Sequence, residues 1–219
     1  MPVSVYIQSA VFVIVAGAAL FGAAGTFAIA GFWIYLAIIA AVTVASLTIL
    51  PTDLILERMR PGGRRPPLSL RLVGFVPLAQ LIVAGLDRGR LHWGDSVPVW
   101  LQALGLVAVA AGFGLFFWAM AVNRFFSSVA RIQADRGQHV VADGPYRFVR
   151  HPGYAGGILL LLFSGLALGS WIAWALLIVL GTPLVLRRAV REDRMLQAEL
   201  PGYADYAGRV RWRVCPGIW

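Results

Sequence analysis

The chain has 219 residues, of which 59% are hydrophobic and 13% are charged, and its mean hydropathy is +0.77. Soluble domains carry about 25% charged residues, so this composition excludes an ordinary soluble protein and predicts an integral membrane protein. All 19 basic residues are arginines, and with 10 acidic residues they give a net charge of +9. Such a surplus orients membrane helices and attracts anionic lipid head groups, and no nucleic-acid-binding motif accompanies it.

The chain begins with a long apolar stretch in which no charged residue precedes Asp53. A secretory signal peptide needs a basic region before its apolar core, so we expect none here. Residues 5–50 are too long for one membrane span, because as a helix they would reach roughly 70 Å. Glycines near the middle therefore predict a turn between two spans, at about 5–24 and 31–50.

Residues 51–67 contain four arginines together with Pro-Gly-Gly and Pro-Pro sequences, and we expect a loop without a packed element. A third span is predicted at about 69–86, with Pro77 as a kink site. A short loop of mixed charge follows at 87–97. Residues 1–97 thus form a first unit of generic membrane spans.

A fourth span is predicted at about 98–122, and it opens the second unit of the chain, residues 98–219. Ala108 and Gly112 lie four residues apart in this span, and small residues at that spacing let membrane helices pack closely. Gly112 and Gly114 also form a Gly-x-Gly pattern, which in a membrane helix more often reflects packing than a cofactor site.

The next apolar block, residues 154–186, would reach roughly 50 Å as one helix, which is too long for a simple span. Gly169 near its middle predicts a hairpin of two short helices, 154–168 and 171–187, with a single kinked helix as the alternative. The predicted fold class is therefore all-α, a polytopic membrane bundle of about five to six transmembrane helices whose last two form this hairpin.

The tail, residues 187–219, carries seven arginines. One apolar edge of a short amphipathic helix is predicted there by Met195, Leu196 and Leu200. Pro201-Gly202 should break that helix, after which Tyr203 and Tyr206 share a face.

Arginine counts predict the orientation of the bundle. Segments 51–71 and 123–153 hold five arginines each, whereas loop 87–97 holds two. An even number of spans places these two segments and the tail on one side, which the positive-inside rule predicts to be cytoplasmic.

The polar segment ends in Arg150-His151-Pro152, with Tyr154 following. Proline suits the first turn of a helix, so Arg150 and His151 are expected at a helix N-terminus, whose positive end favours an anion. The alternative is interfacial anchoring without a ligand. Upstream, a turn at Asp143-Gly144-Pro145-Tyr146 is expected to bring Tyr146 to the same pocket.

A second polar cluster lies at the end of the last apolar block. Arg188 and Glu192 are four residues apart, so an ion pair on one helix face is the simplest interpretation. The functional alternative is that Glu192 accepts hydrogen bonds from a ligand hydroxyl or ammonium. No metal site is predicted, because His92 and His139 lack a second ligand at suitable spacing and Cys215 is the single cysteine.

Taken together, these motifs resemble the isoprenylcysteine carboxyl methyltransferase family, which belongs with the membrane phospholipid methyltransferases. The resemblance covers about residues 123–219. It depends on the segment from Gly144 to Gly156, on Arg188, on Glu192-Asp193, on the segment from Tyr203 to Tyr206, and on Val210. It implies S-adenosylmethionine as cofactor, bound by the last spans at the cytoplasmic face.

Carried over by position, the resemblance also implies the site residues. Cofactor binding is implied for Gln138, His139, Val140, Val141, Tyr146, His151, Pro152, Gly153, Tyr154 and Glu192. Arg188 and Glu192 are implied as catalytic residues, with Arg188 on the substrate side. The family usually has two glutamates where this chain has Glu192-Asp193, which leaves the role of Asp193 open.

The sequence thus predicts an S-adenosylmethionine-dependent integral membrane methyltransferase that acts on a lipidic or prenylated small-molecule acceptor. The arginine-only set of basic residues and the abundance of Ala and Gly favour a bacterial inner-membrane location, with the active site facing the cytoplasm. One alternative is an NADPH-dependent enzyme of the sterol-reductase type, which is similar around an Arg-His-Pro-x-Tyr motif. The other is a non-enzymatic membrane protein whose arginines bind anionic lipids.

Overall fold

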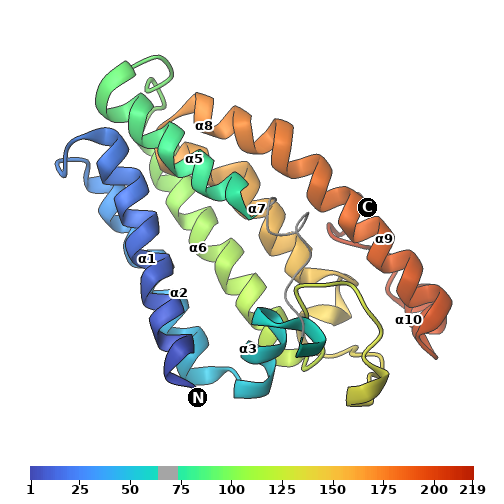
Figure 1. The fold of residues 1–219 in the computed structure, drawn as a ribbon. Coiled ribbons are helices and arrows are strands. Elements are labelled where there is room, and N and C mark those ends of the chain that lie inside the picture. The colour runs from blue at the N-terminus through green and yellow to red at the C-terminus, as the bar shows by residue number, and fades with distance from the viewer. Residues whose placement is uncertain (64–73) are drawn as a thin grey trace.

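The computed structural model describes residues 1–63 and 74–219, and these residues form helices and turns without a β-strand. Four helices within them are long and apolar enough to cross a membrane: α1 (Val3–Ala24), α2 (Ala30–Ile49), α6 (Val99–Val122) and the continuous helix Trp171–Glu199. The shorter apolar helices α5 (Phe75–Leu86) and α7 (Pro152–Ala167) pack among them. Figure 1 shows the resulting bundle, which confirms the predicted all-α polytopic fold.

Three predicted spans match helices closely. The expected boundaries 5–24, 31–50 and 98–122 differ from those of α1, α2 and α6 by no more than two residues. Gly25 ends α1 in the left-handed conformation, with φ 70°, and its N–H donates to the carbonyl of Phe21. Glycine adopts this conformation at low cost, which explains why the turn falls at this position.

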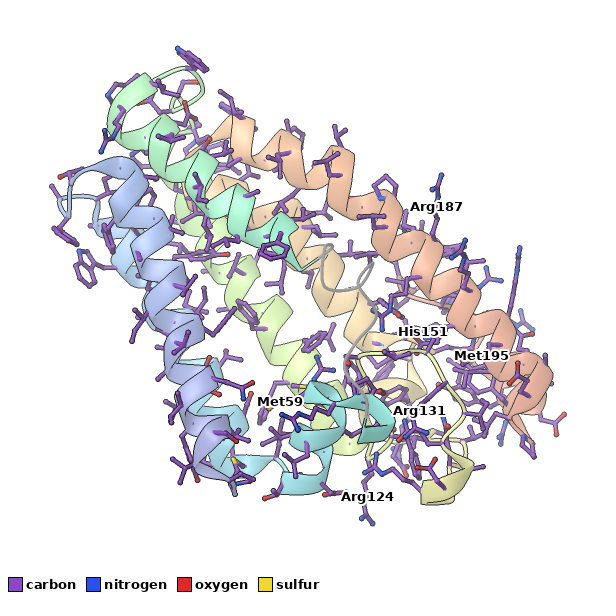
Figure 2. The ribbon with its side chains drawn as sticks, viewed as in Figure 1. Met59, Arg124, Arg131, His151, Arg187 and Met195 are labelled. Atoms are coloured by element: carbon purple, nitrogen blue, oxygen red, sulfur yellow. The ribbon has the colours of Figure 1, made fainter. Side chains whose placement is uncertain are left out.

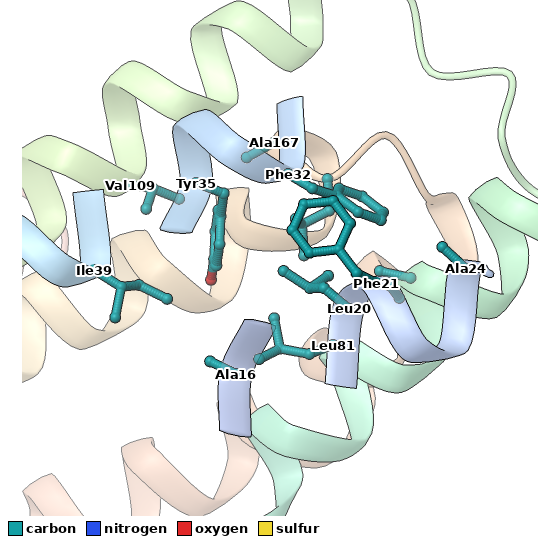
Figure 3. Close-up of a cluster of buried hydrophobic side chains, with 13 residues drawn as sticks. Ala16, Leu20, Phe21, Ala24, Phe32, Tyr35, Ile39, Leu81, Val109 and Ala167 are labelled. Carbon is teal, nitrogen blue, oxygen red and sulfur yellow. The ribbon is translucent and has the colours of Figure 1, made fainter. Parts of the chain in front are cut away.

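The main hydrophobic core lies where α1, α2 and α5 meet the middle of α6, the end of α7 and the residues that follow it. Figure 3 shows Leu20 and Phe21 of α1 packed beside Phe32 of α2 and Leu81 of α5. Leu20 and Phe32 are completely buried. The helices also expose many large apolar side chains on the outside of the bundle, as expected for a lipid-facing surface.

Small residues allow α6 and α7 to approach closely along their length. A Cβ atom on Gly156 would lie 2.5 Å from the carbonyl oxygen of Gly112, and one on Gly105 would lie 2.6 Å from the backbone nitrogen of Ala167. The packing predicted at Gly112 is thus present, and it extends to Gly105 and Gly156. Gly114, by contrast, faces open space.

The expectation of a loop without a packed element at 51–67 is wrong for its first part. Thr52–Met59 form helix α3, and a single turn, η1 (Pro61–Gly63), follows it. The buried side chain of Leu54 packs with Leu50 and Met120 and fixes α3 against α6. This helix is short and follows a proline, so its apolar pattern is too brief to stand out in the sequence. Residues 64–67 lie outside the described residues.

The third predicted span, 69–86, corresponds to α5, although residues 69–73 lie outside the described residues. Pro77 does not kink the helix, because it sits in the first turn, where a missing N–H costs little. After α5 the chain continues as a π-helical turn, η2 (Asp87–Leu91), so 87–97 is more ordered than the loop we expected. Asp87 is buried there and accepts hydrogen bonds from the Ser170 hydroxyl and two backbone N–H groups.

The predicted hairpin is present, but its second arm is much longer than 171–187. α7 turns at Gly169 into α8 (Trp171–Leu176), and η5 (Leu177–Gly181) joins α8 directly to α9 (Thr182–Glu199). The π-helical turn just before Pro183 absorbs the missing N–H of that proline, so the helix continues. The predicted separate amphipathic helix around Met195 is therefore part of α9, which ends before Pro201-Gly202 as expected.

The arginine-rich parts of the chain gather at one end of the bundle. Figure 1 shows α3, the segment 123–151 and α10 (Tyr203–Arg209) at this end, away from the turns that join α1 to α2 and α7 to α8. Segment 123–151 contains two single turns, η3 (Ala134–Arg136) and η4 (Gly144–Arg147), and it fills the space where α9 diverges from α6. The polar segment and the tail therefore meet, as the arginine pattern predicted.

Candidate functional site

A cavity of about 630 Å³ lies at the arginine-rich end, which is within the usual size range of ligand sites. Its walls come from α3, the segment 123–146, the first turns of α7, and α9 with α10. Figure 2 shows His151, Arg131 and Met195 grouped around this region, whereas Arg187 points away from the bundle. Most of the predicted site residues line the cavity: Gln138, His139, Val140, Val141, Tyr146, His151, Gly153, Tyr154, Arg188 and Glu192.

Pro152 is the one predicted site residue that does not line the cavity. It is buried at the first position of α7, where its ring fits the start of a helix. Its neighbour Gly153 borders the cavity, and a Cβ atom there would lie 2.5 Å from the ring of Phe126. Pro152 therefore contributes by setting the start of α7, and Gly153 by making room for an aromatic wall.

The hydroxyl of Tyr154 connects the two predicted catalytic residues. It accepts a hydrogen bond from Arg188 Nε at 2.7 Å and donates one to Glu192 Oε2 at 2.6 Å. Arg188 also donates to the backbone carbonyl of Ser128. Among the described residues, Arg188 and Glu192 do not form the direct ion pair expected from their spacing; instead the phenol of Tyr154 stands between them. Both side chains are thereby fixed at the cavity wall.

Asp193, whose role the sequence left open, is the centre of a buried polar network. Its side chain is completely buried, and its two carboxylate oxygens accept hydrogen bonds from Nε and Nη2 of Arg150, at 2.8 and 2.9 Å. It also accepts from His151 Nε2 at 3.0 Å and from Arg213 Nε at 3.0 Å. The side-chain amide of Gln197 and the hydroxyl of Tyr203 also donate hydrogen bonds to this carboxylate, at 2.8 and 3.3 Å. A single carboxylate thus joins α7, α9, α10 and the tail.

This network changes the interpretation of Arg150 and His151. We expected both at a helix end open to an anion, but their side chains bind Asp193 and their backbone N–H groups donate to the carbonyls of Trp212 and Arg213, at 2.9 and 2.8 Å. Although burial opposes the charge of Arg150, its hydrogen bonds to Asp193 raise the pKa of the guanidinium. The N-terminus of α7 is therefore occupied by the protein's own tail.

The predicted turn before α7 positions Tyr146 as expected. The turn is η4, and it buries Tyr146, whose hydroxyl accepts from Asn123 Nδ2 at 3.1 Å. The Tyr206 hydroxyl donates to the backbone carbonyl of Tyr146 at 2.7 Å, so α10 is attached to the same turn. Burial raises the pKa of both phenols above the usual 10.0, so they stay protonated hydrogen-bond donors to a higher pH than an exposed tyrosine does.

The segment 137–141 forms an outer wall of the cavity and is held by both hydrogen bonds and apolar contacts. The Gln138 side chain accepts from the backbone N–H of Gln133 at 2.6 Å, which holds the loop in shape. His139 is exposed and its ring lies edge-on to Phe125, with centroids 5.0 Å apart. Val140 packs with Tyr203 and Leu200, so this wall also contacts α10.

Several residues at the cavity were not identified from the sequence. Arg58 reaches it from α3, and Phe126, Ser128 and Gln133 come from the polar segment. Glu57, beside Arg58, is buried and accepts hydrogen bonds from Ser127 and Arg131, which ties α3 to the polar segment. No local pattern marks these contacts, because they join stretches about 70 residues apart. A glutamate in the short apolar stretch of α3 is the one available signal of such a contact.

Comparisons with known proteins agree with this part of the fold. Residues 100–200 match the family model described as phospholipid methyltransferase. A cobalt-zinc-cadmium resistance protein, CzcN of Cupriavidus metallidurans, is 29% identical over 130 residues, which are 58% of this chain and 56% of that protein. A nickel-cobalt-cadmium resistance protein, NccN of Alcaligenes xylosoxydans xylosoxydans, is 27% identical over 161 residues, which are 73% of this chain and 66% of that protein.

The chain thus spans less than two thirds of the length of these two curated relatives. The family match covers almost all of α6, the polar segment, α7 and all of α9, which carry most of the cavity wall. The resemblance predicted from the motifs is confirmed over this segment, because residues 100–200 match the phospholipid methyltransferase family model.

Proposed function

We propose that this chain is an S-adenosylmethionine-dependent integral membrane methyltransferase that acts on a lipidic or prenylated small-molecule acceptor. The main support for the proposal is that both polar clusters line the same cavity, at the arginine-rich end of the bundle. Residues 100–200, which form most of its wall, match a methyltransferase family model. By the positive-inside rule this end faces the cytoplasm, in a bacterial inner membrane.

The residues of the cavity suit the chemical groups of S-adenosylmethionine. The Glu192 carboxylate, held by Tyr154, can accept from an ammonium group. The backbone of 138–141 and the aromatic rings of Phe125 and Tyr146 suit a nucleoside. The volume of about 630 Å³ accommodates such a cofactor together with the head group of an acceptor.

When bound, S-adenosylmethionine supplies an activated methyl carbon, and the protein supplies alignment. Glu192 and Tyr154 orient one end of the site, while Arg188 is held by Tyr154 and the Ser128 carbonyl and faces the acceptor side. Alignment of reacting groups is worth up to roughly 7–11 kcal/mol in well-oriented cases. The apolar residues Phe116 and Leu184 exclude water and suit an acceptor chain that enters from the bilayer.

The proposal is tested by binding of tritiated S-adenosylmethionine to purified protein in lipid nanodiscs. Wild type is expected to bind with micromolar affinity, and Glu192→Gln is expected to bind about tenfold more weakly, because a charge-assisted hydrogen bond is lost. Glu199→Gln is the matched control, since this glutamate is exposed at the end of the same helix.

The same preparation separates the alternatives. Thermal stabilisation by NADPH instead of S-adenosylhomocysteine would indicate a reductase. Stabilisation by neither ligand, with binding to anionic vesicles that weakens as salt rises, would indicate a protein that binds lipids without catalysis. Either result would refute the proposed methyltransferase.

A further inference from the structure

Arg58 is a cavity residue from outside the family match. It lies in the last turn of α3, and its guanidinium carbon stacks over the rings of Phe126 and Phe116, at 5.0 and 5.3 Å. Its backbone carbonyl accepts from the Ser128 hydroxyl at 2.8 Å. The N-terminal half of the chain therefore delivers a cation to an aromatic part of the cavity, and the contact with Ser128 fixes where it sits.

The charges around the cavity leave Arg58 without a carboxylate. Arg150 is neutralised by Asp193, and Arg131 by Glu57 and Asp135. Within the described residues, no ion pair involves Arg58, and residues 64–73 contain no Asp or Glu in their sequence. Glu192 is the one carboxylate among the residues that line the cavity.

Arg58 also keeps its charge in this setting. Burial, and then the positive charge of Arg188, lower the pKa of its guanidinium from 12.5 to about 10. The group is still protonated at neutral pH, so the two arginines hold charges that repel each other. An anion between them would relieve this repulsion, and a planar guanidinium presents paired donors that match a carboxylate or phosphate.

The cofactor does not balance these charges. S-adenosylmethionine carries a sulfonium, an ammonium and one carboxylate, so its binding adds one positive charge to a site whose lining is already cationic. An acceptor with a purely cationic head group would add another. An acceptor with an anionic head group lowers the net positive charge of the occupied site. Phe116 and Phe126, beside Arg58, suit the apolar chain next to that head group.

Resting on the function proposed above, we propose that Arg58, together with Arg188, binds an anionic oxygen in the head group of the methyl acceptor and thereby selects amphiphiles that carry such a group over purely cationic ones. Arg58 is then a specificity-determining residue contributed by α3 to a site that is otherwise built from residues 116–206.

Two sources of the anion fit this chemistry. If the anion is a carboxylate nucleophile, a bond forms between its oxygen and the methyl carbon, the carbon–sulfur bond breaks, and the electron pair stays on sulfur. No proton moves. If the anion is a phosphodiester next to an amine, a nitrogen–carbon bond forms, and the amine must also lose a proton to a neighbouring group such as Glu192. In both cases Arg58 holds an anionic oxygen.

The test measures binding of three probes that share one C15 prenyl chain and end in a carboxylate, a phosphoethanolamine or a primary amine. Wild-type protein in nanodiscs is titrated with each probe, with and without S-adenosylhomocysteine. We expect at least tenfold tighter binding of one or both probes that carry an anionic oxygen, the anionic carboxylate and the zwitterionic phosphoethanolamine, than of the cationic amine. We expect this preference to be lost in Arg58→Gln. Arg58→Lys should recover part of it, because the charge returns without the planar fork.

Arg60→Gln is the matched control, because Arg60 is exposed at the end of the same helix. Transfer of tritiated methyl groups then identifies the source, since a methyl ester releases volatile methanol in base and an N-methyl amine does not. Equal binding of all probes to wild type would overturn the proposal. So would an Arg58→Gln variant that loses affinity for S-adenosylhomocysteine by the same factor, because Arg58 would then hold the cofactor's carboxylate. Failure of wild type to bind S-adenosylhomocysteine refutes the proposed function separately.

Discussion

Replacing Asp193 with asparagine tests whether the buried carboxylate holds the candidate site together. The substitution keeps the size of the side chain and removes its charge. Asparagine offers one acceptor oxygen in place of two, and its NH₂ group would face the donors of Arg150 or Arg213. The Arg150 guanidinium would keep two backbone carbonyls, of Val210 and Arg211, but no counter-charge.

The expected magnitude follows from the burial of this pair. The side chains of Arg150 and Asp193 are 6% and 0% exposed, and removing one partner of a buried ion pair costs about 3–5 kcal/mol. In a chain of this length, 1 kcal/mol changes the thermal midpoint by about 2–4 °C. Asp193→Asn is therefore expected to lower the midpoint by about 6–20 °C, because the starts of α7 and α10 and the tail lose their common anchor.

The assay is thermal unfolding of purified protein in nanodiscs, followed by intrinsic tryptophan fluorescence. Asp205→Asn serves as the control, since this aspartate is exposed on α10, and its midpoint should match that of wild type. A midpoint for Asp193→Asn within about 2 °C of wild type would show that the network contributes little, and the account of Asp193 as an anchor would be wrong.

Three further outcomes are expected. Gly156→Ala should lower stability by about 1–3 kcal/mol in the same thermal assay, because its Cβ meets the α6 backbone, whereas Gly114→Ala faces open space and should not. Tyr154→Phe should weaken binding of S-adenosylhomocysteine about tenfold by releasing Arg188 and Glu192, and unchanged affinity would contradict a role for the hydroxyl. Burial raises the folded-state pKa of Tyr146 and Tyr206, so their contribution to stability is complete below pH 10.0 and is lost as the pH rises above it. Tyrosinate absorbance should accordingly rise at higher pH in folded than in denatured protein, and coincident titrations would contradict this burial.

The membrane fold was predictable where the apolar stretches were long. Spans at 5–24, 31–50 and 98–122 are followed by Gly25, Pro51 and Asn123, so hydropathy together with these helix-ending residues determines their limits. α3 was missed, because it is a short amphipathic helix with charged residues that is stabilised by packing against distant parts of the chain. The amphipathic helix around Met195 was predicted, but its continuity with the last span, as part of α9, was not.

Most residues predicted for the site line one cavity, so the order and spacing of the motifs were sufficient to predict that these residues lie together. Arg58 was missed, since nothing in a single sequence tells that a loop arginine will face a segment about 70 residues away. Arg150 was correctly predicted to lie at the start of a helix, with an external anion or interfacial anchoring as its role. Its actual partner is Asp193, an internal carboxylate 43 residues away in the chain that only the fold brings close.

The difference between Glu192 and Asp193 follows from helix geometry. Successive residues of an α-helix point about 100° apart, so neighbouring carboxylates on α9 cannot serve the same partners. Glu192 extends toward the cavity and meets Tyr154, while Asp193 turns toward α10 and the tail. A shorter acid suits the second position, because Arg150 reaches it with a long side chain and several other donors share the space. One dipeptide thus separates a carboxylate that lines the cavity from a buried structural one, and we expect substitutions at 192 and 193 to affect binding and stability respectively.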